Sequence, residues 1–199
     1  MHGLIDFGKE LDSLADLVSA AKAKPGELSY SSAGIGSSSH MATEQFAAAA
    51  GIKMLHIPYR GGAPAATALV SGDVPVSAVS LSSLLPLVES GKVKLLAVTS
   101  EKRVSLAPDV PTVNETGVLK DFKTSVWTAL FAPAGTPEAI VSKIEADVIE
   151  VLKDPGLIAR LDKVGAEVAG MPAAKLRLHI RQETDDFKKI ANEANIRVE

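Results

Sequence analysis

The feature that most constrains the fold is an alternation of short apolar runs and helical patterns between Leu28 and Ser100. The four apolar runs are "LSYSS", "KMLHIPY", "VPVSAVS" and "VKLLAVTS", and glycine or proline lies near their junctions with the helical stretches. Short strands joined by helices are typical of an α/β fold wound in right-handed units. The last run is apolar almost throughout, as expected for a strand of a parallel sheet that is covered on both faces.

Helical periodicity also precedes this alternation. A series of apolar residues recurs at spacings of three and four, and the helix it predicts ends before the breakers Pro25 and Gly26. The series is Leu4, Phe7, Leu11, Leu14 and Val18.

The composition changes after Ser100. Residues 101–122 are polar, contain two prolines and show little periodicity, so they indicate a connecting segment between two packed units. The stretch "TSVWTALFAPAG" predicts a further strand, and Thr136, Pro137 and Glu138 predict the N-cap and first turn of a helix. Two more helical stretches, "PGLIARLDKVG" and "AAKLRLHIRQETDDFKKIANEAN", make the second half mostly helical.

The composition excludes several classes of protein. The formal net charge is −3 and 4% of the residues are aromatic, which argues against a nucleic-acid partner. The absence of cysteine excludes disulfides and thiol catalysis. No apolar run approaches membrane-spanning length, and the opening stretch lacks the basic start and apolar centre of a signal peptide, so we expect none in this sequence.

The sequence also carries no pattern typical of an enzyme. His2, His40, His56 and His179 have no spacing that predicts a metal site, and each is interpreted as a capping, surface or filler residue. The stretch "GIGSSS" is neither a G-x-S-x-G nucleophile elbow nor a phosphate-binding loop with its lysine. We therefore predict no catalytic group, no metal and no cofactor.

One stretch has the properties of an anion-binding loop. In "SSAGIGSSSH" a strand gives way to small residues and then to a helix. Gly34 and Gly36 allow positive φ and close backbone approach, and Ser37 or Ser38 can cap the helix and donate a hydroxyl. Backbone N–H groups at a helix N-terminus favour an anion. The alternative is a tight strand-to-helix turn that binds no ligand.

A second candidate lies in "PYRGGAPA". Tyr59 can donate its phenol, and Arg60 can form a bidentate pair with a carboxylate. The alternative is that Arg60 is a solvated surface charge and that Gly61 only makes a turn into the next helix.

Five segments in a fixed order carry a family resemblance. They are "KPGELSYSSAGIGSSSH", "HIPYRGGAPA", "SGDVPVSAVSLSSLLPLVESGKVKLLAVTS", "APDVPTVNETG" and "FAPAGTPEAIVSKI". Together they resemble the substrate-binding receptors of tripartite tricarboxylate transporters, the Bug family of bacterial periplasmic proteins. The resemblance implies a type II periplasmic-binding-protein, or Venus-flytrap, architecture of two lobes. It also implies a receptor that captures a small carboxylate for a membrane permease in the periplasm and performs no chemistry.

The resemblance also implies how the chain divides. Nothing in this sequence resembles the signal peptide and first strands of the family. Residues 1–122 would then form the complete second lobe, and 123–199 the returning, mainly helical part of a first lobe that is incomplete at its N-terminal strands. Missing strands leave unpaired edges and apolar faces, so we expect a homo-oligomer through that edge or a rearranged lobe.

The family's site residues map onto three places in this sequence. The ligand carboxylate of the family meets a loop that corresponds here to Ala33, Gly34, Ile35, Gly36, Ser37 and Ser38. Tyr59, Arg60 and Gly61 are further candidates, as is Ser80. Many relatives carry an acidic or amide side chain where this sequence has Val79 and Ser80, so an amino acid is a poorer ligand here than a plain mono- or dicarboxylate.

Three classes of function remain open. The chain is a carboxylate receptor, a module that keeps the lobe fold and has lost the ligand, or a sensor domain of the same two-lobed type. A receptor binds carboxylates in isolation, whereas a module associates without them. A sensor needs a signalling partner that this sequence does not contain.

Overall fold

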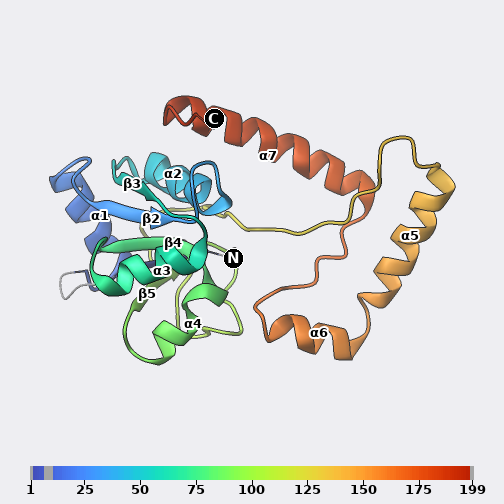
Figure 1. Cartoon of the computed structure of the whole chain (residues 1–199), viewed down its shortest axis with the longest axis horizontal. Coiled ribbons are helices and arrows are strands. Elements are labelled where there is room, and N and C mark those ends of the chain that lie inside the picture. The colour runs from blue at the N-terminus through green and yellow to red at the C-terminus, as the bar shows by residue number, and fades with distance from the viewer. Residues whose placement is uncertain (1, 7–10, 198–199) are drawn as a thin grey trace.

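A computed structural model describes residues 2–6 and 11–197 of the chain. Its centre is a sheet of five strands in the order β3-β2-β4-β1-β5 (Figure 1). Strands β2, β3 and β4 are parallel, as the sequence predicts, whereas β1 is antiparallel to both of its neighbours. The strands are β1 His2–Asp6, β2 Ser29–Ser32, β3 Leu55–Pro58, β4 Val76–Ser80 and β5 Lys94–Val98.

Helices cover both faces of this sheet (Figure 1). On one face, α1 (Leu14–Ala23) and α2 (Ser38–Ala50) contribute to a hydrophobic core together with Val76, Ala78 and Leu96. On the other face, α3 (Gly62–Ser71) and α4 (Leu81–Glu89) pack against Val79, Leu95 and Val98. Apolar residues of the same strand thus point to opposite layers, which explains the continuous apolar runs in the sequence.

The prediction of a helix that begins near Leu4 is wrong for its first part. Residues 2–6 form β1, and the helix begins only at Leu14, capped by the Ser13 side chain. The strand is hydrogen-bonded on both sides, to β4 and to β5, and long-range pairing of this kind overrides local helical periodicity. Phe7, which belonged to the predicted helix, lies outside the described residues.

The segment 101–122 is more than a connection. Val104 and Ala107 are buried in the core on the α3 and α4 side, and Val113 and Phe122 in the core on the α1 and α2 side. An isolated parallel bridge also joins Val98 to Thr112. The segment therefore continues the packed unit, although it has no helical or strand periodicity.

The strand predicted in "TSVWTALFAPAG" is absent from the described residues, where 123–133 runs extended without a pairing strand (Figure 1). The N–H of Thr124 donates to the Thr99 carbonyl at 3.0 Å, but no strand lies alongside to continue a ladder of such bonds. The helix that follows, α5 (Glu138–Val151), has Pro137 and not Thr136 at its N-cap. The Thr136 hydroxyl instead donates to the carbonyl of Pro133, at 2.9 Å.

The C-terminal half is helical, as predicted, with α6 (Pro155–Asp162) and α7 (Ala173–Glu193) following α5. Helix α7 packs beside α2, and its Ile190 is buried. The indole Nε1 of Trp127 donates to Glu183 Oε2 on α7 at 2.7 Å, which ties the extended segment to this helix. Helices α5 and α6 lie away from the sheet (Figure 1).

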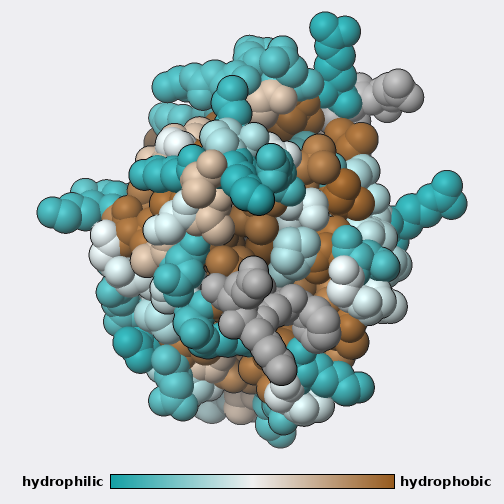
Figure 2. Space-filling view, turned by 90° about the vertical axis from the view of Figure 1, so that its left-hand side faces the viewer, coloured by the Kyte–Doolittle hydropathy of each residue, from teal (hydrophilic) through white to brown (hydrophobic). Residues whose placement is uncertain are grey.

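Surface character differs along the chain. At the end of the molecule that carries α1, hydrophilic side chains project outward with apolar ones between them (Figure 2). Most of the exposed large apolar residues lie elsewhere, in the segment 126–178: Val126, Leu130, Phe131, Ile140, Ile144, Val151, Val164, Met171 and Leu178. Within the described part of the chain, no helix combines the length and apolar character needed to cross a bilayer.

Candidate functional site

The residues predicted as a site come together at the end of the sheet where the parallel strands have their carboxyl ends. These strands are β2, β3 and β4, and each is followed by a turn into a helix. Ala33 to Ser37 form the turn after β2, Tyr59 to Gly61 the turn after β3, and Ser80 ends β4. In open α/β sheets, ligands bind outside the carboxyl ends of the strands.

The turn after β2 is built around two glycines. Gly34 has φ +133° and Gly36 has φ +71°, conformations that disfavour other residues. A Cβ added to Gly34 would lie 3.3 Å from the carbonyl oxygen of Tyr59, so the two turns approach closely at this point. Both the positive φ and the close backbone approach were predicted from the sequence.

Ser37 is the N-cap of α2, as predicted. Its hydroxyl accepts the N–H of His40 at 3.3 Å and donates to the Gly34 carbonyl at 2.7 Å. The Ser39 hydroxyl in turn accepts the N–H of Ala33 at 3.0 Å. These bonds close the turn over the start of the helix.

Three backbone N–H groups at this turn are unengaged. Within the described residues, no hydrogen bond engages the N–H groups of Ile35, Ser38 or Ser39. Ile35 and Ser38 are exposed, whereas Ser39 is buried. Free N–H groups at the N-terminus of a helix present partial positive charge to an anion.

The turn after β3 is joined directly to the first turn. The N–H of Gly61 donates to the Ala33 carbonyl at 3.1 Å, and that of Tyr59 to the Ser32 carbonyl at 3.1 Å. The Tyr59 ring packs against the core on the α3 and α4 side. Arg60 is exposed, and no carboxylate among the described residues pairs with its guanidinium.

The end of β4 adds a cluster of hydroxyls. The Ser80 Oγ lies 3.2 Å from Ser82 Oγ and 3.1 Å from Ser83 Oγ, and Ser80 forms no side-chain cap for α4. A Cβ on Gly62 would lie 2.8 Å from Ser83 Oγ, so this cluster adjoins the turn after β3. Ser83 was missed in the sequence because only the fold places it beside Gly62.

Below the first turn lies a pair of histidines that were interpreted from the sequence as capping, surface or filler residues. The rings of His40 on α2 and His56 on β3 are stacked, with centroids 3.7 Å apart and planes 14° apart. His40 Nδ1 accepts the N–H of Gly36 at 3.1 Å, and His56 Nε2 lies 2.6 Å from the Ser32 hydroxyl. His40 is the third residue of α2, a position from which side chains commonly bond back to the backbone before the helix, and this was the available signal.

Both histidines are held neutral. Burial lowers the pKa of His40. Burial and then the proximity of His40 lower the pKa of His56 to about 4. Glu44 Oε1 lies 4.0 Å from His40 Nε2, a position that favours the charged ring, but this oxygen already accepts the Tyr30 hydroxyl at 2.7 Å. Burial outweighs the effect of Glu44 on the pKa of His40, because the ring is almost fully buried and its Nδ1 already accepts the N–H of Gly36.

A pH dependence of stability follows from the pKa of His56. Because the pKa is lower in the folded than in the unfolded state, the unfolded chain binds more protons between about pH 4 and pH 6.5. We expect the free energy of unfolding to fall by about 1–2 kcal/mol from pH 7 to pH 5. Chemical denaturation at several pH values measures this change.

The matched variant is His56→Gln, which keeps a polar atom for Ser32 and does not titrate. Its fall in unfolding free energy over the same pH range should be clearly smaller. The carboxylates of Asp12 and Glu115 do not confound this range, because their ion pairs and hydrogen bonds lower their pKa values below it. Equal pH profiles for the two proteins would contradict the prediction.

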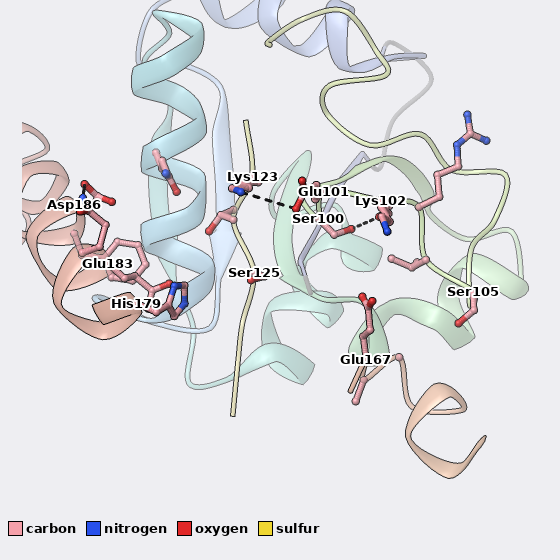
Figure 3. A pocket seen from close by; sticks show the side chains of 18 of the residues that line it. Ser100, Glu101, Lys102, Ser105, Lys123, Ser125, Glu167, His179, Glu183 and Asp186 are labelled. Atoms are coloured by element: carbon pink, nitrogen blue, oxygen red, sulfur yellow. Dashed lines mark hydrogen bonds and ion pairs between the residues drawn. The ribbon is translucent and has the colours of Figure 1, made fainter. Parts of the chain in front are cut away.

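A separate cavity of about 740 Å³ lies between the end of β5, the segment 123–125 and α7 (Figure 3). His179, Glu183 and Asp186 of α7 line one side, and Ser100, Glu101 and Lys102 the other. Lys123 lies between them, 3.9 Å from Glu101. None of the predicted site residues lines this cavity. Its charges are of both signs, so it has no evident preference for an anion.

No group of three or more histidine, aspartate or glutamate residues among those described is arranged to hold a metal ion. The groups at the carboxyl ends of the strands can therefore donate hydrogen bonds to an anion from N–H groups and hydroxyls. Arg60 lies on one of the same turns.

Comparison with known proteins gives a family match over nearly the whole chain. The model of the family described as "Tripartite tricarboxylate transporter family receptor" matches residues 6–196. A curated relative, a UPF0065 protein from the tcbD-tcbE intergenic region of Pseudomonas sp. strain P51, is 35% identical over 177 residues, which are 89% of this chain and 53% of that protein. The chain spans about half the length of the first curated relatives it matches.

Solved structures agree with this match. Rpa4515 of R. palustris with adipate has a TM-score of 0.84 and 33% identity, and the periplasmic binding protein BugD has 0.79 and 32%. MatC of Rhodopseudomonas palustris with bound malate has 0.77 and 29%. The alignments cover 98%, 98% and 95% of this chain and 65%, 66% and 65% of those chains. The predicted fold class is confirmed, and these neighbours are binding proteins rather than enzymes, as predicted.

Proposed function

Because the chain belongs to the tripartite tricarboxylate transporter receptor family, we propose that it binds a small carboxylate at the turns after β2, β3 and β4. The residues we assign to this site are Ala33, Gly34, Ile35, Gly36, Ser37, Ser38, Tyr59, Arg60, Gly61 and Ser80. The observation that carries the proposal is the group of unengaged N–H donors of Ile35, Ser38 and Ser39 at the start of α2.

The chemistry of the three turns supports an anionic ligand. A carboxylate accepts hydrogen bonds from both oxygens, and a charged acceptor makes these bonds stronger than neutral ones. Arg60 adds an unpaired positive charge at the rim, and Ser80 and Ser83 add hydroxyls. The binding of adipate by Rpa4515 and of malate by MatC is consistent with a dicarboxylate.

We further propose that 1–122 and 123–199 belong to two lobes. The sheet, its four covering helices and both hydrophobic cores lie within the first range. The second range contributes Ile190 and Trp127 to contacts but also most of the exposed apolar residues. A ligand held at the carboxyl ends of the strands would then contact the first range as one wall of a site between the two lobes.

The whole family member would act in the periplasm and deliver its ligand to a membrane permease. This part of the proposal rests on the family, whose members are periplasmic binding proteins that work with a transporter.

A thermal-shift screen against adipate, malate, succinate and acetate tests the proposal, with sodium chloride at matched ionic strength as the control. Binding to the folded state at a hundredfold excess over Kd stabilises it by roughly 2.7 kcal/mol. We expect a carboxylate-specific rise in Tm. With aspartate added at the same concentration, we expect a smaller rise than with succinate, because Val79 and Ser80 offer no carboxylate or amide to an ammonium group. Identical Tm values with all four carboxylates and with chloride would contradict the proposal.

A second candidate function is an assembly module, and the exposed apolar residues of 126–178 favour it. Apolar residues mark an interaction surface where they are exposed together in one patch rather than singly. Light scattering on the sample used for the screen separates the two functions. A stable homo-oligomer that ignores every carboxylate supports the module, whereas a carboxylate-dependent shift supports the receptor in any oligomeric state.

A further inference from the structure

The stacked histidines lie directly beneath the turn that we assign to carboxylate binding. We propose that His40 is a positioning residue: its neutral ring holds Gly36 so that the turn keeps the shape that presents the free N–H groups, and this hold is lost when the ring is protonated. The effect on carboxylate binding rests on the proposed function, whereas the effect on the shape of the turn does not.

The direction of one hydrogen bond determines where the proton of the His40 ring lies. Gly36 N–H can only donate, so His40 Nδ1 must accept at 3.1 Å, and the ring proton lies on Nε2. Protonation would place an N–H on Nδ1 and set two donors against each other. Gly36 would then have to move, because the histidine ring is 4% exposed and packed.

Hydrogen bonds hold the turn at both of its glycines. His40 bonds to Gly36, and Ser32 Oγ accepts the N–H of Gly34 at 3.1 Å. Ser32 is in turn 2.6 Å from His56 Nε2. The two stacked rings therefore support the positive-φ residues on either side of Ile35, whose N–H is free.

The surroundings of His40 favour its neutral ring. Tyr30 of β2, Glu44 of α2 and His56 of β3 are the titratable groups near His40. Glu44 is engaged by Tyr30, and a charged His56 would repel a charged His40. Helix α7 also packs against α2, but none of its described ionisable side chains forms a hydrogen bond, ion pair or ring contact with either histidine. Burial lowers the pKa of His40.

The test compares His40→Asn with His40→Leu in the full chain. Asparagine can place an oxygen where Nδ1 lies and does not titrate, whereas leucine has similar bulk and accepts nothing. Amide hydrogen exchange of Gly36, followed by NMR, is the first measurement. At pH 7 we expect His40→Leu to lower the protection of Gly36 about tenfold and His40→Asn to retain most of it.

The pH profile separates positioning from general packing. As the pH is lowered from 7, the His40 ring proton shifts show where this ring titrates. The protection of Gly36 should fall in the wild-type chain in step with that titration, and stay level in His40→Asn. His179→Asn on α7 is the control, since His179 contacts Trp127 and not the turn. If His40→Leu does not fold, the pH profiles of Gly36 protection in the wild-type chain and in His40→Asn still test the role of His40. Wild-type protection that stays level while the His40 ring is protonated, or equal loss of protection in the asparagine and leucine variants, would overturn the proposal.

Calorimetry with adipate at pH 7 adds the functional measurement. We expect His40→Leu to weaken adipate binding about tenfold and His40→Asn to restore most of the affinity. If the wild-type chain does not bind adipate or the other carboxylates, the proposed function fails, and Gly36 exchange still decides the role of His40. If adipate binds equally to all three proteins, the link from His40 to the ligand is wrong.

Discussion

Replacing Phe46 with alanine is expected to lower the free energy of unfolding by about 3–5 kcal/mol. The Phe46 ring is fully buried in the core between the sheet and α1 and α2, and it meets Phe122 edge to face at a centroid distance of 5.9 Å. Truncation removes the buried apolar area and leaves a cavity that a helix-and-sheet core only partly fills. Urea denaturation followed by circular dichroism measures the change.

The matched control for this variant is Phe131→Ala. The Phe131 side chain is 70% exposed, so its truncation should change the unfolding free energy by no more than about 0.5 kcal/mol. The two variants also bear on function, because the buried Phe46 packs α2 against the core, and the N-terminus of α2 carries the candidate site. Similar losses of stability in the two variants would show that the core is not packed as described.

Replacing Ser38 with proline is expected to weaken adipate binding by about 10- to 100-fold. Ser38 is the first residue of α2, and its N–H is one of the three unengaged donors. Proline removes this N–H and is well tolerated at the first position of a helix. Ser37 already has φ −64° and ψ 158°, an extended conformation that suits a residue before proline. Isothermal calorimetry measures the loss of affinity.

The control for the missing N–H is Ser38→Ala, which removes the hydroxyl and keeps the N–H. It should retain more of the adipate affinity than Ser38→Pro, and both variants should unfold within about 0.5 kcal/mol of the wild-type free energy. Wild-type affinity in both would mean that the turn after β2 only caps the helix, which is the alternative left open by the sequence.

Local patterns predicted much of the fold and of the candidate site. The positions of the parallel strands and of the two glycines in the turn after β2 follow from short-range preferences, namely apolar runs bounded by breakers and residues that adopt positive φ. Ser37 as the cap of α2 follows in the same way. Arg60 could be placed on its turn, but the absence of a paired carboxylate among the described residues is a property of the folded chain.

The sequence by itself determined the α/β class, the family and the turn chemistry of the site, because each depends on residues that are neighbours in the chain. Only the tertiary structure decided that residues 2–6 form an inner antiparallel strand, since its partners in β4 and β5 lie about 70 to 95 residues away. It also brought His56 onto His40 and Ser83 beside Gly62. These contacts join residues from different βα units, and no local preference specifies which side chains meet when parallel strands and their helices pack.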